Sequence, residues 1–241
     1  MPSLPLLLPL LLPLLLLALA TTFPLQAKEE RQWRFQPGQW SSQDWVMVRS
    51  PRFPFPGHWV QEEEFLRNQV PPPQEGESPR EYGERLEESD SPRTYVSMVL
   101  ADPVKGRKVT LSSTLSFQYR MAPLLVLANG LGADGEGNPE YREHWEIVLY
   151  DQGINVWHHE FREGKPYWRL AAFLQTPFSP QTPYLLTAQV EFTPKGPKLT
   201  VRCDGKVFGC LLPTLQPNFQ AGFTACEGIN QFWDFTLTTE D

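Results

Sequence analysis

The sequence has little positive charge and no cluster of basic residues. Its 241 residues include 21 Lys and Arg against 28 Asp and Glu, so the formal net charge at pH 7 is −7. Surfaces that bind nucleic acid concentrate Lys and Arg on one face, because these residues neutralise phosphates. We therefore expect no nucleic acid among the partners of this protein.

Cysteine is also scarce, with Cys203, Cys210 and Cys226 in the whole chain. Their spacing does not match a zinc site. A two-residue turn at Asp204-Gly205 would place Cys203 opposite Lys206, which leaves Cys210 too far along the ladder for a bridge. A disulfide would then need Cys226 with one of the other two. Three buried, unpaired thiols are the alternative, and both interpretations stay open.

Long apolar runs are absent after the N-terminus. Residues 1–20, MPSLPLLLPLLLPLLLLALA, form an uncharged Leu run that is interrupted by proline and ends in Ala18-Leu19-Ala20. This pattern predicts a secretory signal peptide over residues 1–20, with an alternative end at Ala27, although no Lys or Arg precedes the run. We expect the protein to be exported, to the periplasm or the extracellular space. After cleavage it would not be an integral membrane protein.

Helical periodicity is weak, whereas short apolar and alternating runs recur between Gly, Pro and Asn. The predicted strands cover residues 45–48, 94–100, 108–119, 124–128, 141–150, 154–159, 167–173, 184–192, 198–202, 207–211, 221–225 and 232–238. Such spacing is typical of a sandwich, here of roughly ten to twelve strands. We predict an all-β fold, a two-sheet antiparallel jelly-roll sandwich, as one domain over residues 28–241.

An acidic, proline-rich insertion at about residues 61–92 interrupts this pattern. It holds ten acidic residues and the run Pro71–Pro73, with few apolar side chains. We predict a long solvated excursion with a helical turn around Glu62–Arg67. It would be a flexible loop or, alternatively, a lid over a site.

The segment YREHWEIVLYDQGINVWHH, residues 141–159, is predicted to form two strands joined by a turn at Asp151-Gln152-Gly153. Successive side chains of a strand point to opposite faces. Carboxylate, imidazole, phenol and indole groups therefore gather on one face, as in a ligand-binding surface. The candidate ligand-binding residues, two of them from the turn before the last strand, are Arg142, His144, Glu146, Tyr150, Asn155, Trp157, His159, Trp168, Glu227 and Asn230.

Glu146 lies between two apolar residues of its strand. Burial in a cleft would raise its pKa, so Glu146 could act as a general acid, with His144 as the second catalytic candidate. The competing interpretation is an exposed carboxylate paired with Arg142 or Arg169. Both stay open.

No metal site and no cofactor are expected. The rings of the adjacent His158 and His159 would point to opposite faces of a strand and would not share one ion. A structural calcium ion bound by Asp134, Glu136 and Asn138 is the alternative, although their spacing follows no known calcium loop.

Three segments together resemble the concanavalin A-like lectin and glucanase superfamily. They are LTVRCDGKVFG (199–209), FWDFTL (232–237) and the hairpin over residues 145–157. The resemblance implies a jelly roll in which the middle strands of a concave sheet bind or cleave glycans. It departs from the retaining glucanases, which carry E-x-D-x-x-E on one strand. Here Glu143 and Glu146 would face opposite ways, and a second carboxylate would come from Glu160, Asp234 or Glu227.

Three functions follow from these observations. We expect an exported glycan-binding protein that holds a poly- or oligosaccharide on the concave face of its central strands. The first alternative is a glycoside hydrolase or polysaccharide lyase with Glu146 as the essential acid or base; a lyase would use His144, Tyr150 and Arg142 or Arg169. The second alternative is a structural or protein-binding sandwich of an envelope complex, with the acidic insertion as its recognition segment.

Overall fold

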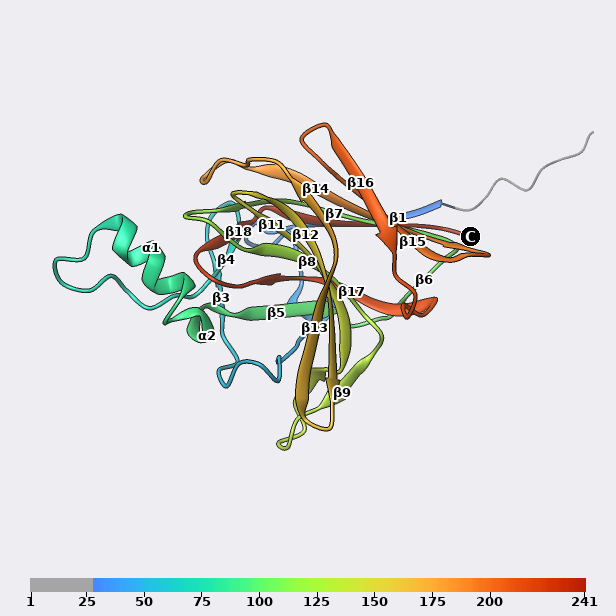
Figure 1. Cartoon of the computed structure of the whole chain (residues 1–241), viewed down its shortest axis with the longest axis horizontal. Helices are drawn as coiled ribbons and strands as arrows, with labels where there is room; N and C mark the ends of the chain where they lie inside the picture. Colours follow the sequence, from blue (N-terminus) through green and yellow to red (C-terminus); the bar gives the residue numbers. More distant parts are fainter. Residues whose placement is uncertain (1–27) are drawn as a thin grey trace, which may run out of the picture.

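Two antiparallel sheets packed face to face make up most of the protein, which confirms the predicted two-sheet sandwich (Figure 1). The computed structural model describes residues 28–241, and the predicted signal peptide lies outside them. None of the helices in this described part is long and apolar enough to cross a membrane.

The nine-stranded sheet runs in the order β16-β15-β14-β7-β18-β4-β3, and β19 pairs with both β7 and β1. Its strands are β1 (Lys28–Arg34), β3 (Trp59–Gln61), β4 (Leu66–Asn68), β7 (Lys108–Phe117), β14 (Tyr184–Thr193), β15 (Gly196–Cys203), β16 (Lys206–Leu211), β18 (Asn230–Phe232) and β19 (Asp234–Glu240).

The eight-stranded sheet runs in the order β13-β12-β11-β8-β17-β5-β2, and β6 pairs with β17. Its strands are β2 (Trp45–Met47), β5 (Val96–Leu100), β6 (Val104–Lys105), β8 (Pro123–Ala128), β11 (Glu143–Tyr150), β12 (Gly153–Arg162), β13 (Lys165–Gln175) and β17 (Asn218–Ala225). A small separate sheet pairs β9 (Leu131–Ala133) with β10 (Pro139–Tyr141), on either side of the segment that holds Asp134, Glu136 and Asn138.

The main core lies between the two sheets. On β11 the alternating residues Trp145, Ile147 and Leu149 point into it and are fully buried. A second, smaller apolar cluster covers the opposite, outer face of the eight-stranded sheet, with Leu124 and Val126 among its members. Because β8 has a core on each side, all six of its residues are buried.

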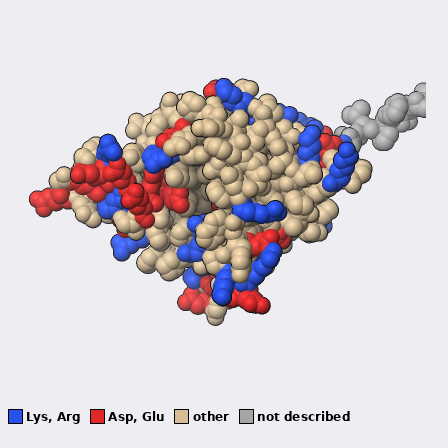
Figure 2. All heavy atoms as spheres, in the orientation of Figure 1, with Lys and Arg blue, Asp and Glu red and all other residues tan. Residues whose placement is uncertain are grey.

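The acidic insertion is more ordered than predicted. The expected helical turn around Glu62–Arg67 is wrong, because β3 and β4 pair there as an antiparallel hairpin. A helix instead follows as α1 (Pro79–Glu87), then α2 (Ser91–Thr94), and a short 3₁₀ helix η1 (Ser42–Asp44) precedes β2. Asp and Glu gather at the end of the molecule where α1 lies (Figure 2).

A capping box starts α1. The Ser78 hydroxyl accepts a hydrogen bond from the Glu81 backbone N–H, and the Glu81 carboxylate accepts one from the Ser78 backbone N–H. Pro79 fits the first helical position, where no N–H is needed. Leu86 is the buried contact of the helix, and Arg85 forms ion pairs with the neighbouring Glu77 and Asp90.

The cysteines form no disulfide. Cys203, Cys210 and Cys226 are all free thiols. Cys203 pairs with Lys206 across the Asp204-Gly205 turn, as the turn geometry predicts.

Candidate functional site

A cavity of about 270 Å³ opens on the outer face of the eight-stranded sheet, above β11 and β12. Its floor consists of cross-strand neighbours, since Glu146 lies opposite Trp157 and Val148 lies opposite Asn155. Side chains from three further segments contribute to the wall. They are Arg52 and Phe53 from the loop after β2, Trp168 from β13, and Cys226 and Glu227 from the turn before β18.

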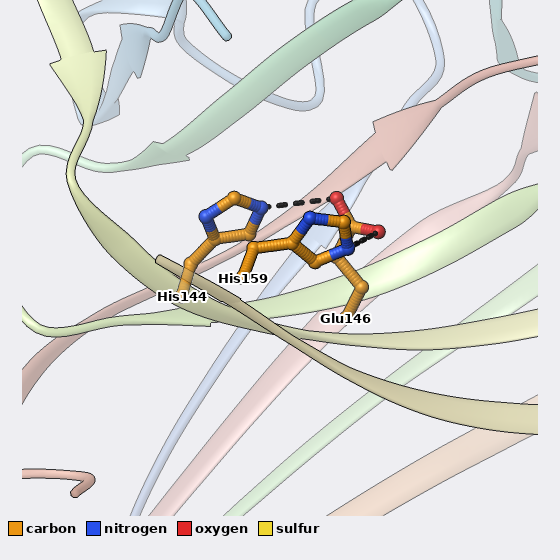
Figure 3. Close-up of side chains that lie close together, drawn as sticks. All are labelled: His144, Glu146 and His159. Atoms are coloured by element: carbon orange, nitrogen blue, oxygen red, sulfur yellow. Dashed lines mark hydrogen bonds and ion pairs between the residues drawn. The ribbon is translucent and has the colours of Figure 1, made fainter. Parts of the chain in front are cut away.

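Glu146, which lines this cavity, bridges two imidazoles with its carboxylate (Figure 3). Nε2 of His144 lies 3.0 Å from Oε1 of Glu146, and Nε2 of His159 lies 3.0 Å from Oε2. The two histidines are direct cross-strand partners, and their rings stack with planes 10° apart. Their side chains are 2% and 3% exposed and that of Glu146 is 14% exposed, so the group is almost dry.

The two imidazoles determine the charge of Glu146. Burial by itself would raise the pKa of Glu146, but His159 and His144 outweigh it and hold that pKa well below its usual range. Burial lowers the pKa of His144, so this ring stays neutral near pH 7. An ionised Glu146 accepts hydrogen bonds only, so each ring donates from Nε2–H. The two buried Nδ1 atoms then have no hydrogen-bond partner within residues 28–241.

A column of four rings runs from a buried tyrosine to the edge of the cavity. Tyr141 stacks on His144 at 4.3 Å between centroids, His144 on His159 at 4.8 Å, and His159 on Trp168 at 6.5 Å. Tyr141 is anchored by a 2.7 Å hydrogen bond between its hydroxyl and that of Ser97. Trp168, which is 53% exposed, is therefore supported from beneath by a chain of packed rings.

A second carboxylate–imidazole cluster lies on the opposite face of the same hairpin. Nε2 of His158 lies 2.8 Å from Glu143, and its Nδ1 lies 3.4 Å from Glu160. His158 is 1% exposed and stacks on Trp145 at 4.1 Å. This cluster was not predicted, although residues 143, 158 and 160 share one face of the hairpin by alternation.

Each cluster brings three possible metal ligands within 4.8 Å of one another. Imidazole nitrogens bind a metal along lone pairs that lie in the ring plane. Because the rings of His144 and His159 are nearly parallel, their lone pairs do not converge on one point. In the second cluster Arg169 donates to His158, and Arg162 pairs with Glu160. Both arrangements suit hydrogen-bonded carboxylates better than a bound cation.

In the loop proposed as an alternative calcium site, the carboxylates of Asp134 and Glu136 are already paired with other side chains of the protein. Arg49 forms ion pairs with Asp134 and Glu136, at 2.8 and 3.3 Å. The Asn138 side chain donates to both of these carboxylates. These contacts, together with the isolated bridge between Arg49 and Glu140, hold the loop against the segment that follows β2.

The structure brings most of the predicted ligand residues together. The residues of that set that line the cavity are Glu146, Tyr150, Asn155, Trp157, His159, Trp168 and Glu227. His144 lies one ring behind His159 in the column. Arg52, Phe53 and Tyr95 also line the cavity and were missed. Arg52 and Phe53 come from an irregular segment, and Tyr95 lies beside a strand that is far from the hairpin in the sequence.

Two predicted ligand residues lie outside the cavity. Arg142 forms an ion pair with Glu140 and donates to the Ala133 carbonyl. Asn230 is fully buried, and its side chain accepts from the Cys226 N–H and donates to the Met121 carbonyl. Its amide therefore stabilises the turn and is not free to meet a ligand.

The expectations for Glu146 itself also need correction. The alternative of an exposed carboxylate paired with Arg142 or Arg169 is wrong, because Glu146 is largely buried and its partners are His144 and His159. The predicted rise in its pKa is wrong as well, since these imidazoles favour the ionised carboxylate more than burial opposes it. The expectation that Glu143 and Glu146 face opposite sides of the sheet is confirmed.

Comparison with solved structures shows which fold this is. The chain is similar to β-agarase A from Zobellia galactanivorans, with a TM-score of 0.55 and 8% identity over 90% of this chain and 93% of that one. It is also similar to lectin UEA-II complexed with galactose, with a TM-score of 0.52 and 8% identity over 88% of this chain and 98% of the lectin. No protein-family model and no curated protein matches the sequence. The fold is the concanavalin A-like jelly roll, as the sequence resemblance implied.

Proposed function

We propose that the protein binds a poly- or oligosaccharide in the cavity above β11 and β12, with the outer face of this sheet as its concave, ligand-facing side. The observation that carries the proposal is the presence of two indole side chains beside a largely buried, ionised carboxylate. Trp157 and Trp168 line the cavity beside Glu146. Indole rings cover the apolar faces of sugar rings, while an ionised carboxylate accepts strong hydrogen bonds from sugar hydroxyls. The names of the similar structures, an agarase and a lectin with galactose, support the same ligand class.

Affinity for purified polysaccharides tests this proposal. Trp157→Ala should weaken binding at least tenfold, which corresponds to about 1.4 kcal/mol. Trp233→Ala is the matched control, since Trp233 is also half-buried but packs on Phe65 beside the other sheet. The proposal fails if no plant, algal or bacterial polysaccharide is retained, or if the two variants bind alike.

Glycoside hydrolysis is a second candidate, because the pKa values of two carboxyl groups in the cavity are shifted in opposite directions. Burial raises the pKa of Glu227, and the charge of Glu146 raises it further, while Arg52 opposes the rise. The pKa of Glu146 is held low. Such a split separates an acid from a base or nucleophile. Glu227 would protonate the glycosidic oxygen, and the ionised Glu146 would attack the sugar or activate a water.

Release of reducing sugar ends distinguishes this candidate from binding alone. If the protein is a hydrolase, Glu227→Gln should abolish turnover while the substrate still binds. Activity of the unaltered protein should also decline as the pH rises through the pKa of Glu227. A protein that retains a polysaccharide but releases no sugar over the whole pH range is a binding protein. A lyase that uses Arg142 or Arg169 is disfavoured, because neither residue lines this cavity.

We further propose that the protein is exported to the periplasm or the extracellular space. The proposal rests on the uncharged Leu run of residues 1–20 and the small residues that end it. N-terminal sequencing of the protein recovered outside the cytoplasm should begin at residue 21, or at residue 28 for the alternative cleavage site. A mature protein that still begins at residue 1 would contradict it.

A further inference from the structure

Arg52 is held at the edge of the cavity by two aromatic rings. Its guanidinium carbon lies 5.1 Å from the ring centroid of Phe53 and 5.1 Å from that of Trp168. The Arg52 backbone N–H also donates to the Ser50 hydroxyl. Cation–π contacts of this kind fix a flexible side chain in one place. Because Trp168 rests on the ring column, this guanidinium is positioned before any ligand arrives.

The charge of Arg52 opposes the rise in the pKa of Glu227 but is not neutralised by direct contact with a carboxylate of the described residues. Within residues 28–241 its guanidinium forms no ion pair, although the whole chain carries 28 acidic residues against 21 basic ones. Arg49, three residues earlier in the chain, differs because it pairs with Asp134. An unpaired cation at the edge of a cavity, in an acidic protein, is the complement of an anionic group on a ligand.

The negative and positive charges of the cavity lie at different depths. Glu146 lies at the floor, where two imidazoles share its negative charge. Arg52 is exposed at the wall formed by its loop, beside Trp168. With aromatic rings packed against the guanidinium, its N–H groups remain for a ligand. Those N–H groups match the two oxygens of a carboxylate or a sulfate.

We propose that Arg52 binds the anionic group of an acidic glycan, either the carboxylate of a uronic acid or a sulfate ester. This inference rests on the proposed glycan-binding function and adds the class of glycan. The neutral part of the sugar would cover Trp157 and reach the carboxylate of Glu146. The acidic group would lie nearer solvent, on the guanidinium of Arg52.

Matched pairs of oligosaccharides test the inference. One pair is an oligouronate and its methyl ester, and the other is a sulfated galactan oligosaccharide and its desulfated form. We expect the protein to bind the acidic member of one pair at least tenfold more tightly than the neutral member. Arg52→Gln should remove this preference, so that the variant binds the acidic and the neutral member of the pair alike. Arg52→Lys, which keeps the charge but loses the fork, should retain part of the preference.

Arg202→Gln is the control, because Arg202 is exposed on β15 of the other sheet, and it should change nothing. Raising the salt from about 50 to about 500 mM should weaken binding of the acidic ligand only when Arg52 is present. The pair that shows the preference identifies the group as carboxylate or sulfate. Equal binding of acidic and neutral sugars, unaffected by Arg52→Gln, overturns the inference while the proposed function stands. Failure to bind any glycan overturns the proposed function itself.

Discussion

Replacing Glu146 with Gln should destabilise the protein at neutral pH. The ionised carboxylate accepts from Nε2 of both His144 and His159. A carboxamide of the same shape has one oxygen to accept one of these N–H groups, and its NH₂ group faces the other. One imidazole therefore loses its acceptor in a nearly dry environment. The substitution tests whether the bridge seen in Figure 3 stabilises the fold.

The size of the effect follows from the burial of the three side chains. Both histidines are almost fully buried, and Glu146 is 14% exposed. A hydrogen bond to a charged group contributes about 1.5–3 kcal/mol, and an unsatisfied buried donor costs about 1–3 kcal/mol. A change of tautomer in one ring would recover part of this loss. We therefore expect the free energy of unfolding to fall by about 2–4 kcal/mol.

The difference in the free energy of unfolding between the unaltered protein and Glu146→Gln should shrink as the pH falls. The pKa of Glu146 in the folded protein lies well below its ordinary value of 4.5. Its charge therefore stabilises the fold fully above pH 4.5, and this contribution is lost as the pH falls through the folded pKa. Burial lowers the pKa of His144 from 6.5, so below that pH the unfolded chain binds a proton that the folded one does not. Glu146 and His144 therefore both lower the stability of the protein as the pH falls. Only the contribution of Glu146 is removed in the Glu146→Gln variant.

Urea unfolding at intervals between about pH 7.5 and about pH 3 measures the size of the stability loss and its dependence on pH. Glu63→Gln is the control for the charge change, because Glu63 is an exposed carboxylate of the β3–β4 turn. It should not differ from the unaltered protein by more than about 0.5 kcal/mol. The reasoning would be refuted by a Glu146→Gln protein of unaltered stability at pH 7.5, or by a deficit of equal size throughout the range.

Three further outcomes test the rest of the fold. A Cβ at residue 153 would lie 2.1 Å from the Leu174 carbonyl oxygen, so Gly153→Ala should lower the free energy of unfolding by about 1–3 kcal/mol in urea. Asn68 donates to two buried backbone carbonyls and accepts from a backbone N–H, so Asn68→Ala should cost about 2–4 kcal/mol in the same assay, and an unaltered midpoint would contradict this. Burial raises the pKa of the Cys210 thiol to about 11 and that of Cys226 well above its usual range, so a disulfide reagent at about pH 8 should label both much more slowly in the folded protein than after unfolding.

Much of the cavity floor could be predicted from the sequence, because alternation and one tight turn determine it. Asp151 and Gln152 form the turn, and Tyr150 then pairs with Gly153. Counting back along both strands places His144 opposite His159 and Glu146 opposite Trp157. No distant contact is needed for this result, since the side-chain period of a strand is two residues.

The rest of the site depends on tertiary packing that no local pattern encodes. Arg52 lies in a proline-rich loop without periodicity, far along the chain from the hairpin it meets. Glu227 and Asn230 share one turn and looked equivalent, yet Glu227 faces the cavity and Asn230 holds the backbone of the turn. The helix α1 had a readable start in Ser78 and Glu81, but its acidic composition favoured a disordered interpretation.

The hairpin carries two similar clusters back to back, and their surroundings give them different roles. Glu143 accepts from His158 and from Asn129, whose amide also donates to a backbone carbonyl next to the cluster. Glu146 has two imidazole partners and lines the cavity. Substituting Gln for Glu143 should therefore reduce stability but leave glycan affinity unchanged, whereas Glu146→Gln should reduce both. Glycan affinity measured on the two folded variants tests whether only Glu146 contributes to binding. If Glu143→Gln weakened binding as much as Glu146→Gln, the ligand would not be confined to the outer face of the sheet.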